Sequence, residues 1–231
     1  MKYAFTNGII LDGTRDMKPQ TNLCILVQDG KITGIVPDTT DLHDYRIIDL
    51  HGHYILPGLI NMHVHLAGSG KPQKKQRDNE KLVHTIMGSS LTRAIAYKMV
   101  AGFAKDELLG GVTTIRTVGG LGSFDTRLRD EIEAGTKTGP RILASNQGIS
   151  VPGGHMAGSV AVAASSISDA LAHLEQSEKE KVDLIKLMIT GGVLDAKEKG
   201  VPGELKMPPE MVRAICEKAH ADGYLVAAHV E

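Results

Sequence analysis

Two histidines separated by one residue, His63 and His65, end an apolar run that begins at Tyr54. The run predicts a buried strand over residues 54–65. Side chains two residues apart on a strand point to the same face, so both imidazoles can reach one metal ion, and neutral imidazole is a common ligand of Zn²⁺. In a chain with 10 histidines such a pair can also arise by chance. Its meaning therefore depends on the other candidate residues.

Two further polar residues that could take part in chemistry, Lys186 and His229, lie in later apolar runs. Lys186 lies within 182–189, where a buried ammonium is costly unless it has a partner. It is either the ion-pair partner of a neighbouring carboxylate, a side chain that reaches solvent, or a functional group. His229 ends the apolar segment 224–229, where a lone histidine can be structural or can bind a ligand.

The elements that hold these residues indicate a parallel βα architecture. After Pro57-Gly58, apolar strands alternate with helical patterns, which is typical of a parallel sheet. The predicted strands are 54–65, 113–118, 141–145, 184–189 and 225–230, and the predicted helices are 89–109, 166–181 and 208–222. The fold class is therefore α/β, a TIM-type (β/α) barrel of which strands one to five are present. Active sites of such barrels lie at the C-terminal ends of the strands, which is where the candidate ligands fall.

The first 56 residues differ in character from the rest of the chain. They contain short apolar segments at 3–11, 22–28, 31–36 and 46–50, and Asp29-Gly30 is a strong hairpin signal. We predict an N-terminal β-sandwich module over 1–56 and a barrel domain over 57–231.

The barrel domain has about 175 residues, whereas a complete eight-stranded barrel usually needs about 250. An open parallel edge is a liability for solubility. We therefore expect the C-terminal remainder of the barrel, or a second chain, to pair with it.

Composition excludes several classes of partner. The net charge of −1, with 42% hydrophobic and 23% charged residues, is that of an ordinary globular chain and gives no sign of nucleic-acid binding. Uncharged stretches are too short to span a bilayer and the N-terminus lacks a signal-peptide core, so we expect a cytoplasmic protein with no membrane contact. Cys24 and Cys216 lack the spacing of a redox pair or zinc knuckle and are predicted to be free, buried thiols.

The segments 57–65 and 111–116, together with Lys186 and His229, resemble the amidohydrolase superfamily. Within it the chain is similar to the imidazolonepropionase-like and Xaa-Pro dipeptidase-like branch, over essentially all of its length, including the N-terminal module that in this superfamily pairs with C-terminal strands.

The resemblance implies a centre of two divalent metal ions, usually zinc. His63 and His65 would bind one ion, His229 the other, and a carboxylated Lys186 would bridge them. Such ions lower the pKa of a bridging water and polarise a carbonyl, so that hydroxide attacks an amide carbon at neutral pH. The family's further histidine from strand six and its proton-shuttling aspartate from strand eight would lie beyond Glu231, so no catalytic residue is expected within this chain.

Two more residues are candidates for contact with the substrate. Similar relatives place a histidine from the loop after strand three near the substrate, which here is His155, although a solvated loop histidine is the alternative. Arg116 could bind a carboxylate through its guanidinium or could be a structural ion-pair partner. The chain departs from the peptidase-like relatives at Thr117, where they often carry an acidic residue, and at 230–231, where they carry an aromatic residue.

We therefore expect a metal-dependent amidohydrolase that cleaves a C–N bond of a small amide, cyclic amide or dipeptide, in a protein that self-associates. One alternative is a noncatalytic truncated relative or assembly subunit. The other is a mononuclear deaminase of the same superfamily. Those deaminases generally lack the bridging lysine, so Lys186 argues against that alternative.

Overall fold

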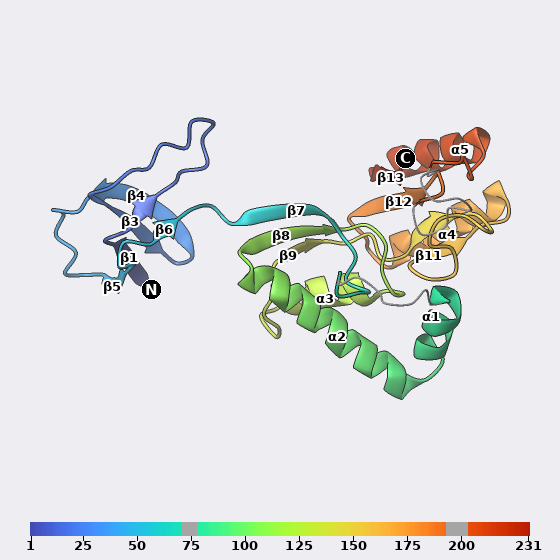
Figure 1. Ribbon diagram of the computed structural model, residues 1–231, viewed down its shortest axis with the longest axis horizontal. Helices are drawn as coiled ribbons and strands as arrows, with labels where there is room; N and C mark the ends of the chain where they lie inside the picture. Colours follow the sequence, from blue (N-terminus) through green and yellow to red (C-terminus); the bar gives the residue numbers. More distant parts are fainter. Residues whose placement is uncertain (71–77, 193–202) are drawn as a thin grey trace. The chain divides into compact units, whose positions relative to one another are not determined.

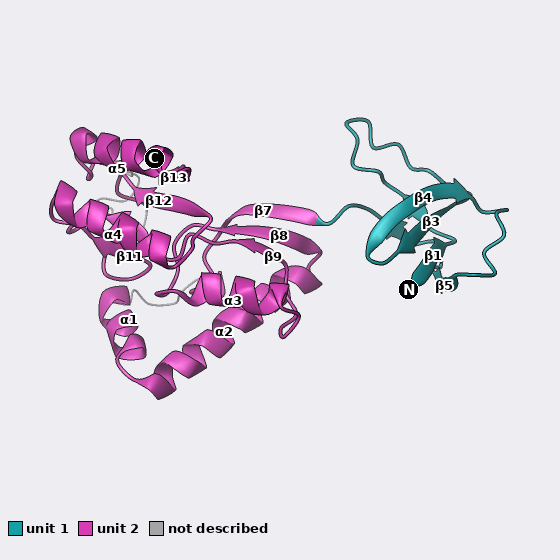
Figure 2. Ribbon diagram, turned by 180° about the vertical axis from the view of Figure 1, so that it is seen from behind, with its two compact units in different colours: residues 1–58 teal, residues 59–231 magenta. Residues whose placement is uncertain are grey.

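The protein is described here by a computed structural model covering residues 1–70, 78–192 and 203–231. Its chain divides into two compact units, Met1–Gly58 and Leu59–Glu231 (Figure 2). No helix in the described part of the chain is both long enough and apolar enough to cross a membrane.

The first unit is built from short strands. Its four-stranded sheet has the order β4-β3-β1-β5, and a parallel pair, β2-β6, lies outside this sheet. The predicted hairpin is confirmed: β3 and β4 are antiparallel, and both turn residues have positive φ, 51° at Asp29 and 78° at Gly30. The strands are β1 (Lys2–Thr6), β2 (Ile9–Ile10), β3 (Leu23–Gln28), β4 (Lys31–Pro37), β5 (Arg46–Asp49) and β6 (Tyr54–Ile55).

Two predicted strands are wrong in their extent. The strand predicted over 3–11 is broken at Asn7, whose φ of 52° takes it out of the extended region. The strand predicted over 54–65 is interrupted after β6 and resumes as β7 (Leu59–Val64). Pro57 lies in this interruption, and proline has no N–H to donate to a ladder.

The second unit contains two parallel sheets. One has the order β7-β8-β9 and the other the order β11-β10-β12-β13 (Figure 1). Residues 141–150 connect them, because β9 pairs with β8, β10 pairs with β12, and the Ala144 carbonyl accepts a hydrogen bond of 2.7 Å from the Asp183 N–H. The strands are β8 (Val112–Thr117), β9 (Arg141–Leu143), β10 (Gly148–Ser150), β11 (Ala161–Ala163), β12 (Leu184–Met188) and β13 (Leu225–His229).

Five helices accompany these strands in the described part of the second unit. Helices α2 and α3 lie along the β7-β8-β9 sheet, and α4 and α5 lie beside the other sheet (Figure 1). Ser89 and Ser166 cap α2 and α4 by accepting hydrogen bonds from Thr92 N and Asp169 N. The bounds are α1 (Asn79–Met87), α2 (Ser90–Leu109), α3 (Phe124–Glu133), α4 (Ile167–Lys179) and α5 (Pro209–Ala221). Helices α1 and α3 lie outside the predicted helical ranges.

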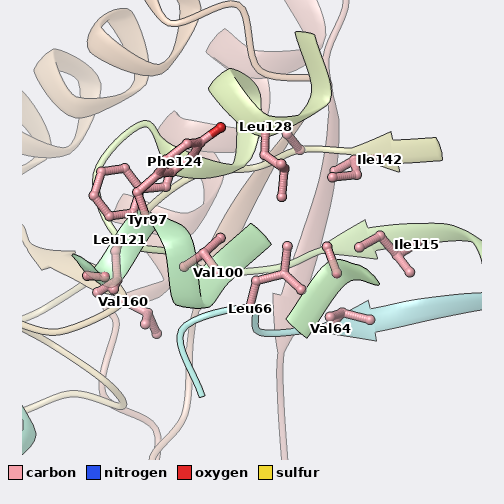
Figure 3. Packing of buried hydrophobic residues seen from close by; sticks show 13 residues of the cluster. Val64, Leu66, Tyr97, Val100, Ile115, Leu121, Phe124, Leu128, Ile142 and Val160 are labelled. Atoms are coloured by element: carbon pink, nitrogen blue, oxygen red, sulfur yellow. The ribbon is translucent and has the colours of Figure 1, made fainter. Parts of the chain in front are cut away.

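Packing of the apolar core between helices and strands determines which face of β7 presents the candidate metal ligands. Val64 and Leu66 are buried against residues of α2 and α3, such as Tyr97 and Leu128 (Figure 3). Since side chains alternate along extended backbone, His63 and His65 point to the opposite face. Burial of the apolar face thus fixes the direction of both imidazoles.

Candidate metal centre

The imidazoles of His63 and His65 lie together at the C-terminal end of β7. Their ring centroids are 5.3 Å apart, with an angle of 62° between the ring planes. His63 is exposed and His65 is half-buried. The two rings are neighbours on one face, which is the arrangement that a shared metal ion requires.

The ring of His65 is held by a backbone carbonyl. Its Nδ1 lies 3.1 Å from the carbonyl oxygen of Gly119, in the turn after β8. With Nδ1 donating to that oxygen, Nε2 is unprotonated and free to bind a metal ion. Metal-binding histidines usually make such a contact through the nitrogen that does not touch the metal.

His229, at the end of β13, is also held by a backbone carbonyl, but through its other ring nitrogen. Its Nε2 lies 3.2 Å from the Gly191 carbonyl oxygen, which leaves Nδ1 free. His155 stacks on the ring, with centroids 4.1 Å apart and ring planes within 10° of parallel. The predicted loop histidine therefore lies against a predicted ligand.

Lys186 lies on β12, beside β13, and is 2% exposed. Burial, together with the positive charge of Arg116, lowers the pKa of Lys186 to about 8. No carboxylate in the described part of the chain offsets these effects. The ion-pair explanation for this lysine therefore receives no support, and about a tenth of the amine is uncharged at pH 7.

The pKa values of all three histidines are lowered. Burial is the largest cause at His63, His65 and His229, and the charge of Lys186 adds to it at each of them. The same charge acts on all three rings, which supports their proximity to Lys186. A lowered pKa keeps the imidazoles neutral at physiological pH, and only neutral imidazole binds metal.

Arg116 is tied to the neighbouring strand. Its Nε donates a hydrogen bond of 2.8 Å to the carbonyl oxygen of Met62 on β7. This contact is a hydrogen bond to the backbone and not the ion pair that the alternative explanation for Arg116 expects. It also fixes the guanidinium beside the histidine pair.

The donor set fits a divalent ion only in part. Within residues 1–70, 78–192 and 203–231, no three His, Cys, Asp or Glu side chains gather closely enough to hold a metal. The two histidines of β7 supply a pair, and Lys186 supplies an oxygen ligand only after carboxylation. A complete centre on these residues therefore needs both that modification and ligands from elsewhere in the protein.

The structure adds supporting residues that the sequence did not single out. Ser145 Oγ accepts a hydrogen bond of 3.0 Å from Gly119 N, and Ser145 N donates one of 3.3 Å to Thr117 Oγ1. Asp125, at the start of α3, is 1% exposed and lies against Gly120. The one signal in the sequence was the Gly119-Gly120 pair directly after a strand.

Burial raises the pKa of Asp125 to about 6, against a smaller opposing effect of the Thr117 hydroxyl. Its ordinary value is 3.8, so between these two values the folded state binds more protons than the unfolded state. Stability therefore falls as pH rises through this window, and the cost persists above it. A difference of about two pKa units corresponds to about 3 kcal/mol.

We expect Asp125→Asn to remove this pH dependence, because the amide stays neutral. The metal-free variant should be more stable than the parent at about pH 8, by on the order of 2 kcal/mol, and similar to it only at about pH 3, below both pKa values. Urea unfolding at both pH values measures the difference. Asp130→Asn, on the same helix but with a side chain that is 60% exposed, is the control and should keep the parent's slope. An unchanged slope in Asp125→Asn would contradict the assignment.

The fold and these residues define a class of protein. The model of the amidohydrolase family matches residues 54–231, and the chain belongs to this family. The membership expected from the motifs is thereby confirmed.

Solved structures and curated relatives agree with the family. A putative prolidase from Bifidobacterium longum is 33% identical, with a TM-score of 0.74 over 99% of this chain and 49% of its own length. A Xaa-Pro dipeptidase with bound methionine is 28% identical, with a TM-score of 0.78 over 100% of this chain and 57% of its own. A dihydroorotase from Caldanaerobacter subterraneus subsp. tengcongensis is 36% identical over 75 residues, which are 32% of this chain and 16% of the relative. The chain thus spans about half the length of these solved structures.

Proposed function

We propose that this chain forms the first part of a binuclear metal-dependent hydrolase that cleaves a C–N bond in a small amide or dipeptide. One observation carries the proposal: Lys186 is buried, has no carboxylate partner among the residues that the structure describes, and acts electrostatically on three histidines. A buried cation in that position is costly, whereas a carboxylated lysine between two metal ions is not.

In this proposal His63 and His65 would hold one ion, with His65 Nε2 available for it. His229, whose Nδ1 is free, would hold the other ion, and a carboxylated Lys186 would be a ligand that both ions share. Such ions, of which zinc is the expected kind, would supply Lewis acidity for activating water and polarising the carbonyl. Further ligands and the proton-shuttling aspartate come from the remainder of the barrel or from a second chain.

Carboxylation of Lys186 is consistent with its surroundings. The uncharged amine attacks the carbon of CO₂, a new N–C bond forms, and one proton leaves the nitrogen. The pKa of about 8 makes the uncharged amine available near neutral pH. The product carries a negative charge, which the guanidinium of Arg116 stabilises.

The substrate end of the site contains Arg116 and His155. Within the described chain, Nε is the guanidinium atom of Arg116 that makes a hydrogen bond, so the terminal nitrogens can pair with a carboxylate. A dipeptide with a free C-terminal carboxylate has the matching chemistry, and the prolidase and Xaa-Pro dipeptidase names of the similar structures agree with it.

A comparison of dipeptides with their C-terminal amides, made on the complete protein, tests the proposal. Zinc-loaded protein is assayed with a panel of dipeptides, their C-terminal amides and cyclic amides. We expect hydrolysis that a chelator abolishes, and a preference of about tenfold or more for the free carboxylate, because a hydrogen bond to a charged group is worth about 1.5–3 kcal/mol. Release of ammonia from aminated rings alone would instead support a deaminase. Metal-loaded protein that is inactive on every substrate would favour the noncatalytic alternative.

A further inference from the structure

The turn after β8 presents the carbonyl that orients His65. Gly119 has a φ of 127°, in a region that residues with a Cβ rarely adopt. A Cβ at this position would lie 3.3 Å from Cε1 and Nδ1 of His65. Glycine is therefore required for the close approach, but glycine also has the least intrinsic restraint on where its carbonyl points.

Ser145 supplies the missing restraint at one side of the turn. Its hydroxyl accepts the Gly119 N–H at 3.0 Å and donates to the Asn146 carbonyl oxygen at 3.1 Å. Its own N–H donates to Thr117 Oγ1 at 3.3 Å. Ser145 is 1% exposed and Thr117 is fully buried, so water does not compete for these bonds. Because its hydroxyl both donates and accepts, it has one favourable orientation.

The other side of the turn is restrained by packing. A Cβ at Gly120 would meet the carboxyl group of Asp125, with Oδ2 at 2.4 Å. Gly119 is thus held between a hydrogen bond on its nitrogen and a side chain packed against the next residue. Any shift that relieves one restraint moves the Gly119 carbonyl relative to His65 Nδ1.

We propose that Ser145 is a positioning residue for the metal centre, which acts through Gly119 to hold His65 with Nε2 toward the ion. The inference rests on the proposed function, because it assumes that His65 binds metal. Without the Ser145 hydroxyl, the Gly119 N–H is buried and unpaired, which is unfavourable because a buried donor has no water to bond instead. The turn relieves that cost by moving, and His65 loses its fixed carbonyl partner.

Two buried serines allow a matched test. Ser150 is also fully buried, but its hydroxyl has no hydrogen-bond partner in the part of the chain that the structure describes. Ser145→Ala and Ser150→Ala therefore delete the same atom in similar surroundings, and only the first leaves a donor unpaired. Zinc affinity of the complete protein is measured by competition with a chromophoric chelator. The visible spectrum of the Co²⁺-loaded form reports the ligand geometry.

We expect Ser145→Ala to bind the ion at His63 and His65 about tenfold more weakly, as is typical when an outer partner of a ligand is lost. Its cobalt spectrum should change, while Ser150→Ala should match the parent in both measurements. If Ser145→Ala does not fold, Thr117→Val, which removes the acceptor of Ser145 N with little change of shape, should weaken binding in the same direction.

Different results would overturn the proposed function and the role of Ser145. A parent protein that binds no metal would overturn the proposed function itself. A parent that binds metal, with Ser145→Ala equal to Ser150→Ala in affinity and in spectrum, would overturn the role of Ser145 alone. Equal weakening in both serine variants would indicate general loosening of the barrel, and would also overturn it.

Discussion

Replacing Lys186 with alanine should lower the metal content of the complete protein from about two ions per copy to one or fewer. The carboxylated lysine is proposed as the ligand shared by both ions, so its loss removes a bond from each. A Lewis-acid ion supplies several kcal/mol of transition-state stabilisation, which corresponds to a rate loss of about 100-fold or more. Elemental analysis and the dipeptide assay measure the two effects. Lys179→Ala, at an exposed position of α4, is the control and should change neither.

The alanine variant also allows a chemical rescue. Truncation of a buried lysine leaves a cavity at β12. Acetate can enter such a space and offer carboxylate oxygens to metal, whereas acetamide has similar size and no charge. We expect acetate, and not acetamide, to restore part of the metal content. A Lys186→Ala protein that still carries two ions without any addition would contradict the bridging role.

Gly119→Ala is expected to have the second large effect. The backbone at this position, with φ of 127°, disfavours any residue with a Cβ. The added methyl group would also press on the His65 ring at 3.3 Å. We expect a loss of stability of about 1–3 kcal/mol from strain, and a loss of zinc affinity of about tenfold or more because the ligand is displaced.

Gly135→Ala separates these two effects. Gly135 also has positive φ, 71°, but a Cβ there would meet nothing within 4 Å. This control should lose stability and keep the parent's zinc affinity, as measured by thermal unfolding and chelator competition. If Gly119→Ala binds zinc as tightly as Gly135→Ala, the carbonyl of Gly119 does not orient a ligand.

Much of the second unit could be predicted from sequence because its signals are local. Alternation of apolar strands with amphipathic helices fixed the parallel arrangement, and serines before α2 and α4 marked their starts. Interruptions within strands, and very short strands, were harder to predict. Asn7 interrupts a run that reads as one strand; its φ is positive, and its side chain donates a hydrogen bond to Asp49, which is distant in sequence. Strands β10 and β11 have three residues each, too few for any periodicity to appear.

The candidate ligands could be found from sequence, but what orients them could not. His63 and His65 were recognisable from their spacing on a strand. The choice of ring nitrogen was not, because it depends on carbonyl groups of Gly119 and Gly191 that are distant in sequence. The same holds for Ser145, which becomes meaningful only when the end of β9 lies beside the turn after β8.

The most direct test of the central claim is the metal stoichiometry of the complete protein. The protein is purified without added metal, with every copurifying polypeptide retained, and is analysed by elemental mass spectrometry. The account predicts about two zinc or similar divalent ions per copy of this chain. A content of one ion or none, unchanged after incubation with zinc and bicarbonate, would contradict a binuclear centre built on His63, His65, Lys186 and His229.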